Sequence, residues 1–282
     1  MNFTPRYLGR GSWLARRDPR LVVLAVVCFV FAAIQVWDIR LMLVLAVIAF
    51  AWYGSARIPF HEVRRQWLFV ISFVALLVIG NGIFASGRVQ RVPGDVIHIY
   101  GYVPLLGTPV SAESLAFAAT QYVRFLSMAA IGFPVAFAID PAAFGVTFAR
   151  LGVPYRFAFA LDLTWRFIPS LGADLRTTRD AQRVRGMEFE GGRGGLVARL
   201  RRQAPIVIPT VVNAIAGAED TIDAMDLRSF GTGKRTWLHE LRFDRTDRLV
   251  LLAFVGLLVV ATIAGFATTS SLLWVPPFML PG

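Results

Sequence analysis

The chain has 282 residues, of which 56% are hydrophobic and 17% are charged, and its formal net charge is +11. This balance and a mean hydropathy of +0.60 exclude an ordinary soluble domain. The positive charge does not indicate a nucleic-acid partner, because basic residues next to membrane spans give the same excess and face anionic lipid headgroups. We therefore expect a protein of the lipid bilayer that binds no nucleic acid.

Five apolar segments are candidate membrane spans. A spanning helix needs roughly 20 apolar residues, and four segments approach that length: Leu21 to Trp37, Trp67 to Ala85, Leu115 to Ile139 and Leu249 to Ala267. The fifth, Leu41 to Tyr53, is short enough for a half-buried helix. Its terminal Trp52 and Tyr53 are typical of interfacial anchors, so we count it as a tilted span.

The distribution of arginine orients these spans, because basic residues are retained in cytoplasmic loops. With the N-terminus in the cytoplasm, nearly all the basic residues between Arg150 and Arg248 are cytoplasmic, and the exterior segments hold Arg40, Arg88 and Arg91. The opposite orientation would translocate almost all of the positive charge. The sequence thus predicts a multi-pass protein with a cytoplasmic N-terminus, which we expect not to be cleaved as a signal peptide.

The region between Asp140 and Asp247 differs from the rest of the chain. It has no long uncharged stretch, yet its apolar residues recur with helical spacing. One long helix is expected to follow Pro154, to kink at Pro169 and to end near Gly186. A second is expected to follow a basic cluster, to include the apolar residues 205–218 and to end at "LRSFGTG", residues 227–233.

These elements predict an all-α integral membrane protein with about five transmembrane helices and two long coupling helices at the cytoplasmic face. We divide the chain into a transmembrane helical bundle (1–139), a cytoplasmic coupling-helix region (140–246), and a final transmembrane helix with an exterior tail (247–282). We expect the three parts to form one structural unit.

Each of the two long helices is expected to end in an arginine between two smaller or apolar residues. The two motifs are Val184-Arg185-Gly186 and Leu227-Arg228-Ser229. A planar guanidinium on a helix end can bind carboxylates or exposed carbonyls of a soluble partner with two parallel hydrogen bonds. The alternative is that these arginines only mark the cytoplasmic side of the membrane.

The chain resembles a known family over nearly its whole length. The runs "ALDLTWRFIPSLGADLRTTRDAQRVRGMEF" (160–189) and "PIVIPTVVNAIAGAEDTIDAMDLRSFG" (205–231) are similar to the T component of energy-coupling factor (ECF) transporters, the EcfT and CbiQ family. Shorter signatures follow in the family's order: "DPR" (18–20), "RLGVP" (150–154), "RFIP" (166–169) and "AMD" (224–226). The family's arginine motif is typically Ala-Arg-Gly. Val184, Leu227 and Ser229 depart from it, which puts the fit of the second motif to its partner in doubt or indicates a differently shaped groove.

The resemblance implies a non-catalytic scaffold in the cytoplasmic (inner) membrane of a prokaryote. It would transmit ATP hydrolysis by two cytoplasmic ABC ATPase subunits to a membrane-embedded, substrate-binding S component, for uptake of a vitamin or a transition-metal ion. Both arginine motifs would dock on the ATPases, which use the ATP, and this chain would bind no cofactor itself.

The resemblance also implies that the apolar stretches of the two long helices contact the S component. Such extensive apolar area on a cytoplasmic helix indicates an interface. The alternative is burial against the chain's own spans. The residues expected at this interface are Phe157, Leu161, Trp165, Ile206, Ile208, Val211 and Ile215.

No catalytic or metal-binding motif is complete in this sequence. "GTGKR" (231–235) ends like a phosphate-binding loop, but Arg228 stands where the first glycine is needed and Arg235 where Ser or Thr is needed. His61 lacks a second histidine at the spacing of a zinc-binding helix. Two other function classes stay open: a self-contained secondary transporter, which would require repeated broken helices, and an integral-membrane enzyme, which would require clustered aspartates or histidines.

One arginine is expected within the bilayer. Arg124 lies in the fourth apolar segment, where a charged side chain costs roughly 2.5 to 3.5 kcal/mol at the helix centre on insertion scales and must face the bundle or snorkel. One hypothesis places it on a substrate pathway. The favoured hypothesis makes it an internal hydrogen-bonded strut, with Asn81 or Gln121 as partner.

Overall fold

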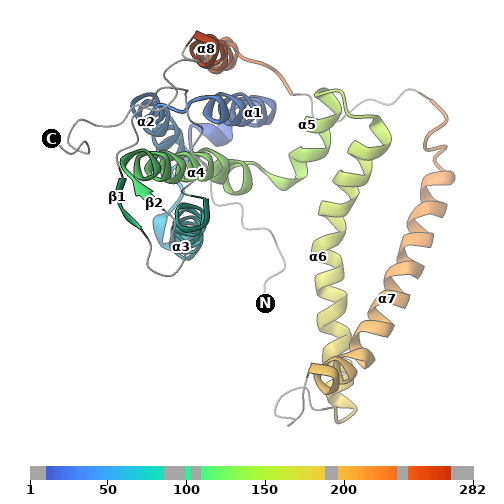
Figure 1. The fold of residues 1–282 in the computed structure, drawn as a ribbon. Coiled ribbons are helices and arrows are strands. Elements are labelled where there is room, and N and C mark those ends of the chain that lie inside the picture. Colours follow the sequence, from blue (N-terminus) through green and yellow to red (C-terminus); the bar gives the residue numbers. More distant parts are fainter. Residues whose placement is uncertain (1–10, 86–98, 103–108, 188–195, 234–240, 268–282) are drawn as a thin grey trace. The chain divides into compact units, whose positions relative to one another are not determined.

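The five apolar segments form five helices in a computed structural model that describes residues 11–85, 99–102, 109–187, 196–233 and 241–267 (Figure 1). Three helices are long and apolar enough to cross a membrane: α3 (Phe60–Ala85), α4 (Ala112–Ala138) and α8 (Arg245–Ala267). Two shorter apolar helices, α1 (Pro19–Gln35) and α2 (Ile39–Ser55), complete the set. The predicted helical membrane protein is therefore confirmed, and the exterior tail (268–282) lies outside the described residues.

The chain divides into two compact units, with boundaries after Asp140 and after Leu241. Among the described residues, the first unit contains α1 to α4 and α8, and the second contains the segment between them. The expectation that the three predicted parts form one structural unit stays a prediction.

In the first unit, α4 contacts α1, α2 and α3, and α1 also packs along α8. The contacts use small residues that let helix backbones approach closely, as is common in membranes. Ala25, Ala33, Ala49 and Ala130 are all fully buried.

The "DPR" signature forms the start of α1. The Asp18 carboxylate accepts a hydrogen bond from the backbone N–H of Arg20 at 2.9 Å and pairs with the Arg20 guanidinium at 2.7 Å. Pro19 occupies the first helical position, where its missing N–H removes no hydrogen bond. Asp38 caps α2 in the same way by accepting from the backbone N–H of Arg40 at 2.8 Å.

The N-terminal ends of α1 and α8 lie together. Arg17 pairs with Asp244 at 3.3 Å and with the buried Asp247 at 3.5 Å. The Thr246 hydroxyl, the backbone N–H of Arg245 and the Arg17 guanidinium hold the pKa of Asp244 below its ordinary value. Both helices therefore enter the bundle from the same side, as the predicted orientation requires.

Two short strands interrupt the helical pattern. β1 (Ile99–Tyr102) and β2 (Pro109–Ser111) pair antiparallel within the connection between α3 and α4, with Ile99 opposite Ser111 and Tyr102 opposite Pro109. No strand was expected from the sequence in this connection.

The second unit begins with two short helices and continues with two long ones. The 3-10 helix η2 (Pro141–Ala143) and α5 (Phe144–Arg150) precede α6 (Tyr155–Val184), and α7 (Leu196–Asp226) follows. α6 begins after Pro154 and contains Pro169, as predicted, whereas α7 begins earlier than the apolar stretch from which it was predicted. Figure 1 shows α6 and α7 as the two longest rods of this unit.

Arg124 of α4 joins its helix to the connection between α1 and α2. Its side chain is 6% exposed, donates hydrogen bonds to the Gln121 side chain and to the Val36 carbonyl, and lies over the Trp37 ring at 4.9 Å. Gln121 is one of the two partners that the strut hypothesis named. The contacts explain how a charged group is accommodated in an apolar bundle.

We predict that Arg124→Leu lowers the thermal stability of the detergent-solubilised protein. The substitution leaves the buried Val36 carbonyl without its donor, which costs about 1 to 3 kcal/mol. Arg64→Leu, at an exposed position of α3, is the control and leaves the melting temperature unchanged. An Arg124→Leu protein as stable as the wild type would contradict the strut hypothesis.

Candidate docking site

The two arginine motifs lie at opposite ends of an antiparallel helix pair. Near the C-terminal end of α6, Gln182 donates a hydrogen bond to the Pro205 carbonyl of α7 at 3.3 Å. Near the N-terminal end of α6, the Phe159 ring lies 4.6 Å from the Phe230 ring, which directly follows the second motif. The arginine motif of α6 therefore lies at one end of the helix pair, and the arginine motif of α7 lies at the other.

Both helix ends are closed by the same hydrogen-bond pattern. At the first, the N–H of Gly186 donates to the Arg183 carbonyl at 2.9 Å, and the N–H of Met187 donates to the Gln182 carbonyl at 3.1 Å. This pair of bonds is the Schellman motif, which satisfies the last carbonyls of a helix.

The second helix end repeats these bonds. The N–H of Ser229 donates to the Asp226 carbonyl at 2.9 Å, and the N–H of Phe230 donates to the Met225 carbonyl at 2.9 Å. Arg185 and Arg228 therefore occupy equivalent positions, one residue before the turn that ends each helix. A cation there also interacts favourably with the negative end of the helix dipole.

The residue after each arginine has a left-handed backbone, a conformation that favours glycine. Gly186 has φ of +83° and Ser229 has φ of +52°. Glycine adopts this conformation without penalty, whereas a residue with a Cβ atom pays about 1 kcal/mol. The departure at Ser229 thus keeps the geometry of the motif and weakens the cap.

The residue before each arginine is nearly fully exposed. Val184 and Leu227 are each 89% exposed, and both arginines are exposed as well. Each helix end therefore presents an aliphatic side chain next to a guanidinium, which is the composition of a protein-binding surface.

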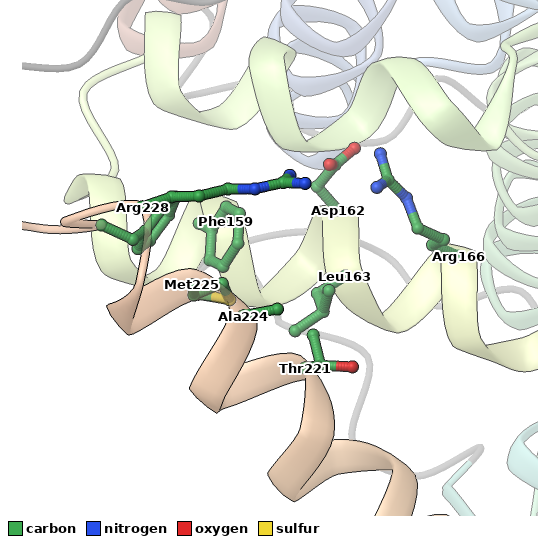
Figure 2. Close-up of a pocket in the computed structure, with 9 residues that line it drawn as sticks. Phe159, Asp162, Leu163, Arg166, Thr221, Ala224, Met225 and Arg228 are labelled. Atoms are coloured by element: carbon green, nitrogen blue, oxygen red, sulfur yellow. The ribbon is translucent and has the colours of Figure 1, made fainter.

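The surroundings of the two ends differ. At the first, Arg183 pairs with Asp180 at 3.9 Å. At the second, Phe230 packs against Tyr155 and Phe159 of α6, and Arg228 lines a pocket with residues of both long helices (Figure 2).

Most of the expected apolar interface is exposed on the second unit. Phe157 is 69% exposed, Ile208 62%, Val211 49% and Ile215 57%. Three further apolar residues of α7 are exposed and were not predicted at this interface: Val207, Val212 and Ile222. Their helical spacing in the sequence could have identified them.

Three expected interface residues are less accessible. Ile206 is buried, Leu161 is half-buried, and Trp165 is half-buried with its ring stacked on Phe144 of α5 at 5.9 Å. Within the described ranges, no three His, Cys, Asp or Glu side chains gather closely enough to hold a metal ion.

We predict that Ser229→Gly strengthens the end of α7. Relief of the left-handed strain should slow amide hydrogen exchange in the last turn of α7 by about twofold to fivefold. The free-energy gain is smaller than the whole strain energy, because glycine also has more conformational freedom in the locally unfolded state. Gly186→Ser should speed exchange at the end of α6. Faster exchange at α7 in Ser229→Gly would contradict the strained cap.

Comparison with known proteins agrees with these observations. The family model of CbiQ, a cobalt transport protein, matches residues 10–238. The chain is 30% identical to the energy-coupling factor transporter transmembrane protein EcfT of Thermanaerovibrio acidaminovorans, over 87% of this chain and 90% of the relative. It is 26% identical to the EcfT protein of Lacticaseibacillus paracasei, over 90% of this chain and 96% of the relative. These matches confirm the resemblance seen in the sequence: the chain belongs to the CbiQ and EcfT family and is a transmembrane component of an ECF transporter.

Proposed function

We propose that this chain couples ATP hydrolysis by two cytoplasmic ABC ATPase subunits to the movement of a membrane-embedded S component that binds the substrate. The observation that carries the proposal is the pair of equivalent arginine-bearing helix ends. The same hydrogen-bond pattern at two helix ends far apart in the sequence supports two similar docking elements rather than scattered positive charge.

The separation of the two ends suits two partner subunits. α6 has 30 residues, so its ends are roughly 45 Å apart. One arginine motif lies at the C-terminal end of α6 and the other lies beside its N-terminal part. Each motif is therefore available to a different ATPase subunit, where the guanidinium would meet carboxylates or carbonyls of a groove.

The exposed apolar surface of α7 supports the S component as the membrane partner. Ile208, Val211, Val212 and Ile215 are each about half exposed or more, and a surface of this kind is stabilised by burial against another apolar protein. The transported substrate, a vitamin or a transition-metal ion, would be selected by the S component. This chain would bind no cofactor, and the ATP would be bound by the ATPases.

The same proposal places the protein in the cytoplasmic (inner) membrane of a prokaryote as a multi-pass subunit. The starts of α1 and α8 are paired, and Arg16, Arg17 and Arg20 lie at the start of α1, which supports a cytoplasmic N-terminus.

We predict that Arg185→Glu/Arg228→Glu abolishes retention of the ATPases. Wild-type chain, affinity-tagged and purified from its native membrane, should bring down two nucleotide-binding subunits and ATPase activity. The double variant should lose both, because truncating or reversing a buried charge at an interface costs about 2 to 5 kcal/mol.

The control is Arg64→Glu/Arg65→Glu, which makes the same charge change at exposed positions of α3, in the first unit. Equal ATPase recovery from the Arg185→Glu/Arg228→Glu variant and this control would contradict the proposal, as would a wild-type preparation without any ATPase.

We also predict that Val211→Ser/Ile215→Ser releases the S component and leaves the ATPases bound. The substitutions remove apolar area that would be buried in the complex, at about 25 cal/mol per Å². Quantitative mass spectrometry of the purified complex measures both partners. Leu171→Ser, at a 39% exposed position of α6, is the matched control; unchanged S-component recovery from the Val211→Ser/Ile215→Ser variant would argue against this surface.

A further inference from the structure

Arg228, the arginine of the second motif, lines a pocket whose other lining residues lie outside the motif. The pocket has a volume of about 300 Å³ and lies between α6 and the C-terminal end of α7. Its α6 side includes Phe159, Asp162 and Arg166, and its α7 side includes Met225 and Arg228. The α6 residues follow at intervals of three and four, so they share one helix face.

Asp162 is held in place from its other side by α5. A Cβ atom on Gly145 would lie 2.7 Å from the Cβ of Asp162 and 2.9 Å from the Ala158 carbonyl oxygen, so only glycine permits this approach of the two helices. The stacking of Phe144 on Trp165 adds a second contact between α5 and α6. The half-buried Asp162 therefore projects into the pocket from a rigid backbone.

Two guanidiniums face this carboxylate. Figure 2 shows the Arg228 side chain extended along the pocket toward Asp162, and the Arg166 guanidinium on the other side of Asp162. Among the described residues Asp162 forms no ion pair within 4.0 Å, so its carboxylate acts on the two guanidiniums at longer range.

We propose that Asp162 is a positioning residue for Arg228, an inference that rests on the proposed function. A free arginine side chain on an exposed helix end samples many rotamers, and docking must order them. The fixed negative charge of Asp162 restricts the Arg228 guanidinium to one side of the helix end before the ATPase arrives. A guanidinium has five N–H donors, so Arg228 can remain near Asp162 while it donates to an acceptor on the ATPase.

Arg166 completes the arrangement. The two arginines and one aspartate carry a net positive charge, so the cluster as a whole attracts the carboxylate or carbonyl oxygens of the ATPase groove. At the first helix end Asp180 pairs with Arg183 at 3.9 Å, and Asp162 lies near the opposite end of α6, so the effect of Asp162 is specific to the second end.

The test is Asp162→Asn, which removes the charge and keeps the shape of the side chain. The assay measures binding of the nucleotide-binding subunits that co-purify with the wild-type chain to full-length protein in lipid nanodiscs. Asp162→Asn should weaken this binding by about threefold to tenfold. Asp174→Asn, an equal change at an exposed position of α6 outside the pocket, is the control.

A double-mutant cycle separates positioning from a structural role. Asp162→Asn should keep its full effect in an Arg185→Gln background and lose it in an Arg228→Gln background, because its action depends on Arg228. Equal weakening in both backgrounds, no weakening in the wild type, or tighter binding would overturn the inference. If the two Arg→Gln variants themselves bind as the wild type does, it is the proposed docking function that fails, and the two failures are thereby distinguished.

Discussion

The positions of Arg185 and Arg228 depend on how the two long helices end. A helix C-terminus leaves its last carbonyls without partners, and a left-handed residue lets the following N–H groups turn back and satisfy them. At Gly186 and Ser229 this turn also stops the helix one residue after an arginine. The chain direction changes there, and Arg185 and Arg228 are left on the outermost exposed turn. Backbone hydrogen bonding thus decides where these two charged side chains are exposed.

Contacts elsewhere in the second unit hold the two long helices, and with them both arginine-bearing ends, in place. α6 and α7 contact each other near both of their ends, through Gln182 and Pro205 at one end and Phe159 and Phe230 at the other. α5 contacts α6 at Gly145, where no side chain larger than hydrogen fits. The two long helices are therefore held together near both ends of the pair.

The first unit meets a different constraint, because its surroundings are lipid. Small buried residues allow its helices to pack closely, and Arg124 is accommodated only through Gln121, the Val36 carbonyl and the Trp37 ring. The exposed apolar side chains of α3 and α8, such as Phe69 and Phe266, are what a bilayer accommodates.

Hydropathy and helix punctuation predicted much of this structure. Apolar length located the five helices of the first unit, and Pro154 and Gly186 marked the two ends of α6, because these signals act locally along the chain. Ile206 was predicted at an interface from its apolar character, but it is buried within the second unit. Sequence periodicity does not distinguish burial inside a unit from burial against a partner. The close approach of α5 to α6 at Gly145 could not be predicted, because it joins residues that are distant in the sequence. The same holds for the position of Arg228 opposite Asp162. The left-handed backbone of Ser229 could not be predicted, because serine rarely adopts that conformation.

The central claim, that both arginine-bearing helix ends contact ATPase subunits, is tested most directly by site-specific photocrosslinking in native membranes. A photoreactive amino acid would replace Val184 or Leu227 in turn, each of which is 89% exposed, with Leu171 as the control position. The account predicts that each helix end crosslinks to a nucleotide-binding subunit and that position 171 does not. Crosslinks from both ends to lipid alone, with no nucleotide-binding subunit captured, would contradict it.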